Sequence, residues 1–433
     1  MYENYELKKF GADKIVFLGM FIISLFIAWL IVSINSTLVF SSPIELAHTG
    51  FSVCMPTGKD WQSDEKWQYE DNVFVLSSNF LVEQKLPAVA VTCRYFLTSQ
   101  NINPRYWLDL QTQDLNNAIV EKGEIQKGNL TIHWSHAEKP LTMYWASAEL
   151  PNNRTIDIEV IQTTVEIDLA WKVFNQVLEK LKFSEDNPVK NGTEIVNQIK
   201  SKGIDTLIDD HSKQVCFLIE DSSGYNVGFT IDLLGMPSTD DQNEVRGASQ
   251  LLFTGRNSQR QYTFFRGDKR LKTYTWQSQT ISREGRVDTQ IILNQTGSIN
   301  VTTQVNNYPR ESNYINCYDI VPSILFELII SQFVRDNYNE AVVDVIESSG
   351  RVTPALISIE PVAEDEVNIS SVIKLEFLDG RDYSQILYLD EDDHLLKEVM
   401  NYEQVYKLEK TDINSIKQAF PGQADNIIQP NLL

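Results

Sequence analysis

The sequence lacks the residue arrangements that most often identify an active site. It contains no His-Glu-x-x-His, no Gly-x-Ser-x-Gly, and no glycine-rich loop ending in Lys followed by Ser or Thr. A zincin-type metal site, a hydrolase nucleophile elbow and a phosphate-binding P-loop are therefore not predicted. We assign no catalytic, cofactor-binding or metal-binding residue from the sequence. A site assembled from distant residues would leave no such motif, so an enzyme with a dispersed site stays open.

Histidine is scarce, with five residues in the chain. His133 and His136 lie three residues apart in a strand-like segment, and this odd spacing places them on opposite faces of a strand. A shared metal ion is therefore not expected. The other three histidines are isolated in the sequence: His48, His211 and His394.

One acidic run, Asp390 to Asp393 followed by His394, has the carboxylates that calcium prefers. It lacks the glycine and the closing glutamate of an EF-hand loop, and it falls where a hairpin turn is due. We therefore interpret the run as a solvated turn.

Basic residues are few relative to acidic ones. Lys and Arg number 37 against 59 Asp and Glu, which gives a net charge of -22 and a pI near 4.7. Such a charge repels the phosphate backbone of nucleic acids, so we predict no nucleic-acid partner. The acidic surface is explained most simply as a determinant of solubility.

Cysteine is also rare, and the four residues divide evenly between the two halves of the chain. Cys54 and Cys93 fall in the first half, and Cys216 and Cys317 in the second. An even count in each half permits one disulfide per half in an oxidising compartment. Free cysteines packed as small apolar side chains are the alternative, since all four lie in apolar surroundings.

Long apolar runs are absent apart from one. Ile15 to Ile34 contains twenty residues without a charge, IVFLGMFIISLFIAWLIVSI, and about 20 helical residues span a bilayer core. The sequence predicts a transmembrane helix over residues 15–37, with residues 1–14 in the cytoplasm because Lys8, Lys9 and Lys14 precede it. The chain is then a single-pass, signal-anchored protein of the cell membrane, with its remaining mass extracytoplasmic, or periplasmic in a Gram-negative type of envelope. A cleaved signal peptide is the alternative.

Residues 43–185 are expected to form a first domain of the α+β class. Asn103 as N-cap and Pro104 at the first helical position predict a helix, and the apolar spacing from Ala170 to Leu181 predicts a second. Strands and helices together indicate an antiparallel sheet with helices packed on it. The expected strands are Phe51–Met55, Asn72–Ser77, Ala88–Phe96, Leu130–Glu138, Thr142–Ala148 and Ile156–Thr163.

This order of elements resembles the PsbP-like fold. The matching features are GFSVCMP followed by Trp61, the middle helix, and the final helix that runs into LEKLKF. The resemblance covers about 140 residues of the chain. It implies a binding or assembly module and supplies no catalytic residues.

A linker and short helix are expected over residues 186–213, followed by a β-rich domain over 214–420 and a tail over 421–433. Ser184 to Gly192 is polar, and a helix from Thr193 would end at Gly203. Hairpin turns are predicted at Asp221–Gly224 and Asp379–Gly380. The run from Val321 to Phe333, VPSILFELIISQF, is too short to span a bilayer and is expected to form an amphipathic core or lid helix.

A long antiparallel meander interrupted by one apolar helix resembles the half-barrel of the LolA/LolB lipoprotein carriers. The nearest likeness is an extended strand ending in YLDEDDHLLKEV, followed by another strand. The resemblance implies a curved sheet around an apolar cavity, with the Val321–Phe333 helix as its lid. A concave side filled by side chains is the alternative.

Taken together, these patterns predict a non-enzymatic, membrane-anchored envelope protein that binds a protein partner or a lipid-like ligand. Two alternatives remain. A hydrolase with a dispersed site would show a deep cleft with converging carboxylates of shifted pKa. A structural tether would show a solid second domain and a large exposed apolar patch.

Overall fold

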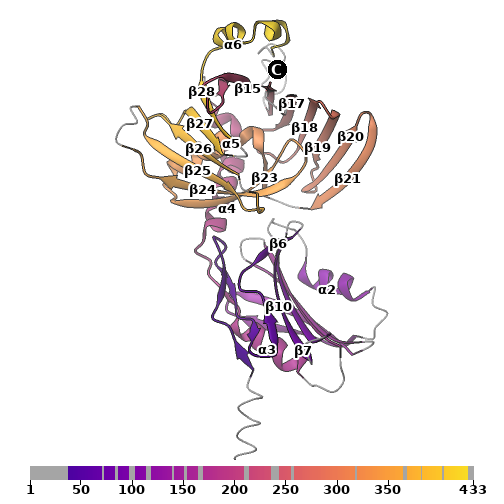
Figure 1. Cartoon of the computed structure of the whole chain (residues 1–433). Coiled ribbons are helices and arrows are strands. Elements are labelled where there is room, and N and C mark those ends of the chain that lie inside the picture. Colours follow the sequence, from indigo (N-terminus) through magenta and orange to yellow (C-terminus); the bar gives the residue numbers. More distant parts are fainter. Residues whose placement is uncertain are drawn as a thin grey trace, which may run out of the picture.

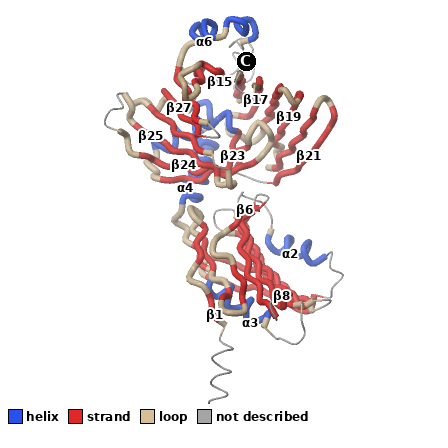
Figure 2. Tube along the Cα trace, in the orientation of Figure 1, coloured by secondary structure: helices blue, strands red, loops and turns tan. Residues whose placement is uncertain are grey.

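The protein is mostly β-sheet, as Figure 2 shows. The computed structural model describes residues 38–427, except 71–72, 83–85, 97–102, 114–118, 139–140, 151–153, 164–168, 209–213, 236–242, 255–257, 317–318, 364–367, 382 and 402–403. In this described part, 55% of residues lie in strands and 19% in helices. The expected α+β class is therefore wrong, because long strands supply most of both domains.

The transmembrane helix expected over residues 15–37 falls outside the described residues. Every helix that the structure does describe is too short or too polar to cross a bilayer. The expected α+β class with a transmembrane helix is thus corrected to a mainly β fold in the described residues, whereas the membrane localisation stays a prediction.

The first domain is built on an eight-stranded sheet. Its main path in space is β5 (Trp61–Ser63), β7 (Val73–Val82), β8 (Leu86–Phe96), β12 (Thr155–Gln162), β11 (Thr142–Glu149), β10 (Leu130–Ala137) and β9 (Ile119–Lys127), and β6 (Gln68–Glu70) pairs with β7. Beside it lie a three-stranded sheet of β13 (Lys182–Phe183), β3 (Phe51–Val53) and β2 (Ile44–Leu46), and the pair β1 (Val39–Phe40) and β4 (Pro56–Thr57).

Two helices cover opposite faces of the large sheet. Met143 and Trp145 of β11 pack with Leu108 of α2 (Pro104–Gln113), whereas the alternate residue Tyr144 packs with Phe174 of α3 (Ala170–Lys180). Successive side chains of a strand point to opposite faces, so α2 and α3 lie on different sides. Both helices were expected from the sequence, and Asn103 Oδ1 accepts the backbone N–H of Arg105 at 2.9 Å, as an N-cap should.

Helix α4 (Pro188–Lys202) begins five residues earlier than expected, inside the segment interpreted as a linker. Asn187 caps it by accepting the backbone N–H of Lys190 at 3.1 Å, and Pro188 occupies its first turn. Gly192 lies against β23 (Glu340–Ile346), where a Cβ atom would come within 1.8 Å of the Val342 carbonyl oxygen. The glycine therefore permits close helix–sheet packing and does not interrupt the helix. The helix ends at Gly203, as expected, and the 3₁₀ turn η1 (Ile204–Thr206) follows.

The second domain is one sheet of fifteen strands. In spatial order they are β21 (Tyr308–Asn316), β20 (Ser298–Val305), β19 (Gly285–Leu293), β18 (Tyr274–Ser282), β17 (Gln259–Asp268), β16 (Glu244–Phe253), β15 (Asn226–Gly235), β14 (Gln214–Glu220), β28 (Val405–Lys410), β27 (Leu395–Asn401), β26 (Ser384–Leu389), β25 (Ser371–Phe377), β24 (Val352–Glu360), β23 and β22 (Ile320–Pro322). All neighbours pair antiparallel except β22 and β23. Both predicted hairpin turns are confirmed, at the β14–β15 and β25–β26 connections.

This sheet curves around α4 and α5 (Phe326–Arg335), as Figure 1 shows. Ile195 and Ile199 of α4 and Ile329 and Phe333 of α5 share one core with Trp276 and with buried residues of β16–β26. The predicted apolar helix is therefore confirmed. Its regular part starts at Phe326, after strand β22 and the 3₁₀ turn η2 (Ser323–Leu325).

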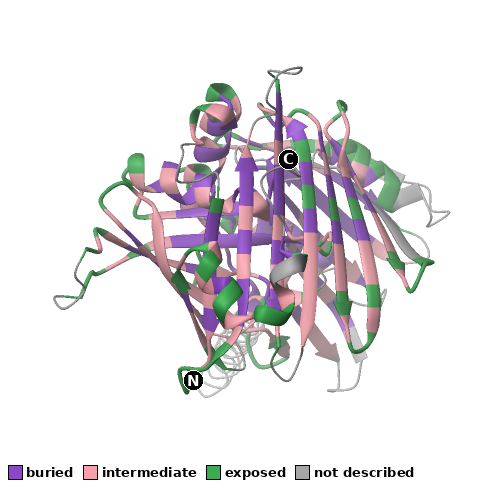
Figure 3. Ribbon diagram, turned by 90° about the horizontal axis from the view of Figure 1, so that it is seen from above, coloured by how far each residue is buried: buried purple, intermediate pink, exposed green. Residues whose placement is uncertain are grey.

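A smaller layer covers the outer face of the same sheet. Ile416 of α6 (Ile413–Ala419) and Ile427, just after η3 (Pro421–Asn426), pack on Phe229, Ile231 and Leu233 of β15. Figure 3 shows buried and exposed residues alternating along strands on this side of the molecule. Alternate residues of β14 and β15 consequently have different surroundings, outside under α6 and inside toward the helices.

The two domains meet at the ends of β12 and β23. Arg154, just before β12, forms an ion pair of 3.0 Å with Asp344 of β23, and the two side chains are 3% and 1% exposed. His48 Nδ1 lies 3.2 Å from Glu340 Oε2, and Asn191 of α4 donates a hydrogen bond to the Glu340 carbonyl oxygen at 2.8 Å. Helix α4 thus joins the two bodies that Figure 1 shows one above the other.

Candidate functional site

A cavity of about 550 Å³ lies between the inner face of the curved sheet and helix α5. Its walls are mainly aliphatic and aromatic, with Val215, Phe217 and Ile219 on β14 and Leu387 and Leu408 on the other arm of the sheet. Ligand sites commonly enclose about 300–1,000 Å³. The concave side is therefore filled by side chains only in part.

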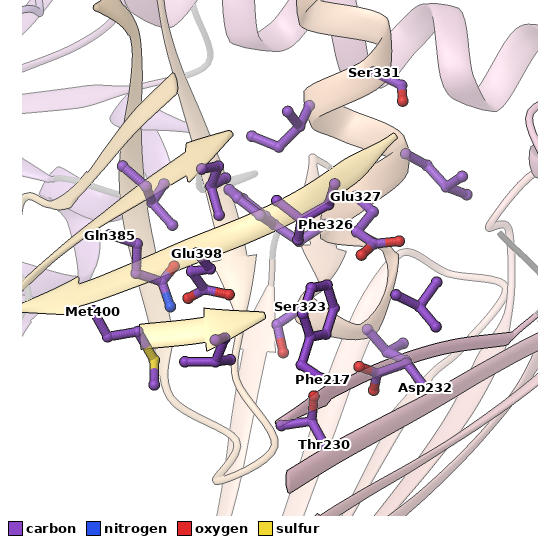
Figure 4. A pocket seen from close by; sticks show the side chains of 18 of the residues that line it. Phe217, Thr230, Asp232, Ser323, Phe326, Glu327, Ser331, Gln385, Glu398 and Met400 are labelled. Carbon is purple, nitrogen blue, oxygen red and sulfur yellow. The ribbon is translucent and has the colours of Figure 1, made fainter. Parts of the chain in front are cut away.

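Three of the six acidic side chains that line this cavity reach it from separate elements, as Figure 4 shows. Asp232 comes from β15, Glu327 from the first turn of α5, and Glu398 from β27. Asp232 points inward because Ile231 and Leu233, its neighbours in the strand, face the outer layer. The fold therefore brings together acidic residues that lie up to 166 positions apart in the chain, from 232 to 398.

Glu398 is the most perturbed of the three. Burial, followed by the negative charges of Glu327 and Asp232, raises the pKa of Glu398 to about 8. Its Oε1 atom is buried and accepts no hydrogen bond from the described residues. A carboxyl group with this pKa is largely protonated at pH 7 and can donate a proton or receive a cation.

Asp232 is perturbed in the same direction but less strongly. Burial raises the pKa of Asp232 to about 6, although a hydrogen bond from Ser249 partly offsets this effect. Ser249 lies directly opposite Asp232 in the β15–β16 pairing. Near pH 7, therefore, one carboxyl group of the cavity is mainly ionised and another mainly protonated.

Of the cationic side chains that line the cavity, Arg335 and Arg381 belong to ion pairs. Arg335 is 3.5 Å from Asp393, and Arg381 is 2.5 Å from Glu347 and 2.7 Å from Asp379. Lys410 is exposed at the end of β28, and its positive charge helps to lower the pKa of Asp390. No basic side chain contributes to the pKa shifts of Asp232 and Glu398.

A second depression at the ends of β16–β19 has the opposite electrostatic arrangement. There the carboxylate of Glu244 contacts both Arg246 and Arg266 at 2.5 Å. Burial opposes the charge of Glu244, but the two arginines outweigh it and hold its pKa below the ordinary value. This carboxylate is already neutralised by the protein, so its arrangement is structural.

The histidines singled out in the sequence are kept apart. His136 is buried and stacks on Tyr144 with ring centroids 4.2 Å apart, whereas His133 lies 3.2 Å from Glu124 of the neighbouring strand β9. Among the residues that the structure describes, no group of three or more His, Cys, Asp or Glu side chains could hold a metal ion. His48 contacts Glu340 at the domain junction, and His211 lies outside the described residues.

The acidic run at 390–394 forms the β26–β27 turn, as predicted. Asp390 Oδ1 accepts the backbone N–H groups of Asp392 at 3.0 Å and His394 at 2.9 Å. Burial opposes the charge of Asp390, but these two hydrogen bonds outweigh it and lower its pKa. The turn also borders the cavity through Asp392, Asp393 and His394, a position that the sequence did not indicate.

Cys54 and Cys93 are buried, free thiols, so the disulfide considered between them is not formed. Burial, reinforced by the charge of Asp157, raises the pKa of Cys93. Cys216 is also free and buried, and Cys317 lies outside the described residues.

Sequence reasoning missed the three carboxyl groups of the cavity. None of Asp232, Glu327 and Glu398 was singled out from the sequence. The available signal was a single charge inside an otherwise apolar segment, as in FELIIS around Glu327 and FTIDLLG around Asp232. Buried charges are costly and are retained mostly for pairing or function, so an isolated charge in an apolar segment indicates a candidate site residue.

No protein-family model and no curated protein matches this chain. Among solved structures, it is similar to a beta-barrel-like protein of the domain of unknown function DUF1849 from Brucella abortus, at 10% identity and a TM-score of 0.35, over 46% of this chain and 95% of that one. It is also similar to a DUF1089 family protein from Pseudomonas aeruginosa, at 11% identity and a TM-score of 0.24, over 39% of this chain and 87% of that one. Neither of these structures is described as PsbP-like or LolA/LolB-like.

Proposed function

We propose that the second domain is a binding module that encloses an apolar or lipid-like ligand inside its half-barrel. The cavity of about 550 Å³, walled by the inner faces of β14–β16 and β25–β28, carries the proposal. Burial of apolar surface is worth about 25 cal/mol per Å². A ligand with a hydrocarbon portion would therefore gain affinity from these walls.

The family resemblances enter as parts of the same proposal. A curved antiparallel sheet around an apolar helix supports a LolA/LolB-like carrier architecture for the second domain. A sheet with α2 and α3 on opposite faces supports a PsbP-like assignment for the first domain. In this proposal the first domain contacts a protein partner and the second holds the ligand.

Binding of the neutral fluorescent probe N-phenyl-1-naphthylamine to the full chain tests the function. We expect saturable binding of one probe per chain with increased fluorescence. The variant Leu251→Trp, which places a larger ring in the cavity, should weaken binding by about tenfold or more, because about 1.4 kcal/mol corresponds to a factor of ten. Val405→Trp, at a position that is 48% exposed on β28, is the matched control and should bind as the wild type does.

Either of two results would contradict the binding proposal. One is the absence of saturable probe binding by a folded wild-type chain. The other is equal binding by the wild type and by Leu251→Trp, which would place the probe on the outer surface.

A second candidate function, a hydrolase, is favoured by the two raised pKa values. Protonated Glu398 could give its proton to the oxygen of a leaving group as the bond to that oxygen breaks. Ionised Asp232 could take a proton from the water whose oxygen forms the new bond. Hydrolysis of 4-nitrophenyl esters and glycosides by the wild type, reduced about 100-fold or more in Glu398→Gln, would replace the binding proposal.

A further inference from the structure

The apolar walls and the acidic side chains of the cavity would contact different parts of a ligand. Hydrocarbon surface surrounds most of the space, yet Asp232, Glu327 and Glu398 reach it from three elements. A carboxylate placed against apolar walls costs several kcal/mol unless a positive charge compensates it. A purely apolar ligand would bury Asp232 and Glu398 further without such compensation, since no basic side chain contributes to the pKa shift of either.

The protein supplies its own positive charges elsewhere. Arg335 and Arg381 are each paired with an acidic side chain, and Lys410 is exposed. Glu398 Oε1 is buried and accepts no hydrogen bond from the described part of the chain. The charges of Glu327 and Asp232 act on Glu398 with the same sign, so the interior of the cavity favours a cation.

The apolar walls favour an organic cation over a metal ion, which has no hydrocarbon part to lie against them. Asp232, Glu327 and Glu398 are all described, and they are not among any group close enough to coordinate one metal ion. An ammonium group at the end of a hydrocarbon chain has three hydrogen-bond donors, which can reach separate acceptors. Its chain would lie against the aliphatic walls.

We propose that the ligand is an amphiphile with a positively charged amine, which binds its ammonium group among Asp232, Glu327 and Glu398 and its hydrocarbon chain along β14, β26 and β28. This inference rests on the proposed binding function and specifies its ligand class. Charge-assisted hydrogen bonds are stronger than hydrogen bonds between neutral groups. The ammonium group should therefore dominate selectivity among ligands of equal chain length.

Calorimetric titration of the full chain with dodecylammonium, dodecanol and dodecanoate, each below its micelle concentration, tests the proposal. We expect dodecylammonium to bind at one site about tenfold or more tightly than dodecanol, and dodecanoate to bind most weakly. Glu398→Gln should remove most of the advantage of the amine over the alcohol. Glu284→Gln, an exposed residue of the β18–β19 turn, should leave all three affinities unchanged.

The outcomes separate this inference from the proposed function. If dodecanol or dodecanoate binds as tightly as dodecylammonium, the cationic selectivity is wrong and the apolar binding function stands. If dodecylammonium binds equally well to Leu251→Trp, its site is the acidic outer surface and the inference fails. If neither the three amphiphiles nor N-phenyl-1-naphthylamine binds, both proposals fail.

Discussion

Glu398 occupies a position where an apolar side chain would fit the cavity wall better. Met400, two residues later, and Leu408 on the neighbouring strand line the same space. The protein therefore accepts an unfavourable buried carboxyl group within an otherwise apolar surface. Such groups are retained for function more readily than for stability, because replacing them with apolar residues often stabilises a fold.

The unfavourable burial of Glu398 should appear in the pH dependence of the free energy of unfolding. Burial and neighbouring acids raise the folded-state pKa of Glu398 to about 8, from an ordinary 4.5. The folded state then binds more protons than the unfolded state between these values, so the contribution of Glu398 to stability is present below about pH 4.5 and lost as pH rises to 8. We expect the wild type to lose stability relative to Glu398→Gln across this window, as measured by urea unfolding at several pH values.

Glu284→Gln is the control for that experiment, because Glu284 is exposed in a turn. Its stability difference from the wild type should not vary across the same window. A constant difference between the wild type and Glu398→Gln would mean that Glu398 titrates at an ordinary pKa. Asp232, whose pKa is raised to about 6, changes stability with the same sign in both proteins, and its coupling to Glu398 is part of the difference that is measured.

Among the elements, α4 determines how closely the helical layer approaches the sheet. Gly192 lies over the Val342 carbonyl group of β23, and Asn191 donates to the carbonyl oxygen of Glu340 in the same strand. Val189, on the preceding turn, is buried with Val342 and Leu356. The helix is thus fixed to β23 by a backbone approach that only glycine permits.

Gly192→Ala should test this close approach. Alanine favours a helix by about 1 kcal/mol over glycine, but its Cβ would overlap the Val342 carbonyl oxygen at 1.8 Å. We expect a net loss of about 1–3 kcal/mol in the free energy of unfolding, as for other overpacked sites. Thermal or urea unfolding measures this loss.

Gly422→Ala is the control, because a Cβ there meets nothing within 4 Å. It should change the free energy of unfolding by no more than about 0.5 kcal/mol. An unchanged or increased stability of Gly192→Ala would show that α4 can shift away from β23 without cost.

Local sequence signals predicted the elements whose ends are marked by capping or turn residues. Asn103 and Pro104 marked the start of α2, and Gly224 and Gly380 marked two hairpins, each with a positive φ of 77°. Strand β9 was missed because its sequence, IVEKGEIQK, is mostly polar. Its Gly123 instead accommodates the Trp134 ring, which would lie 2.6 Å from a Cβ. Because Trp134 lies in the neighbouring strand β10, the sequence of β9 alone does not explain Gly123.

The start of α4 and the convergence of the cavity carboxyl groups were both missed. NPVKNG was interpreted as a linker from its proline and glycine, although Asn187 and Pro188 carry the same N-cap and first-turn signal as Asn103 and Pro104 of α2. The place of Gly192 inside the helix follows only from its contact with β23. Likewise, Asp232, Glu327 and Glu398 converge only because β14 pairs with β28, which brings the two arms of the sheet around α5. Pairing between distant strands is not encoded in any single segment.

For the whole molecule, the ion pair between Arg154 and Asp344 is a deeply buried polar link between the domains. Both side chains are almost fully buried, in contrast to the half-exposed contact of His48 with Glu340. Buried pairs add little net stability over apolar replacements, but removal of one partner leaves an uncompensated charge. The pair therefore favours one relative placement of the two domains.

Arg154→Met should lower the free energy of unfolding by about 3–5 kcal/mol, because it leaves Asp344 buried without its ion-pair partner. The double variant Arg154→Met/Asp344→Leu should recover most of that loss. Unfolding in urea, with each variant compared in a double-mutant cycle, measures the coupling. A double variant that is less stable than both single variants would show that the charges themselves do not couple these sites.

The pairing of β14 with β28 also has a consequence for the order of folding. These are the first and last strands of the second domain in the chain, and they lie side by side in its sheet. Residues of both line the cavity, so its wall is complete only after the chain has been synthesised as far as Lys410. Contacts of such long sequence separation form slowly. During synthesis, therefore, one edge of β14 stays unpaired until β28 has been made. Premature association with another chain would begin at that edge.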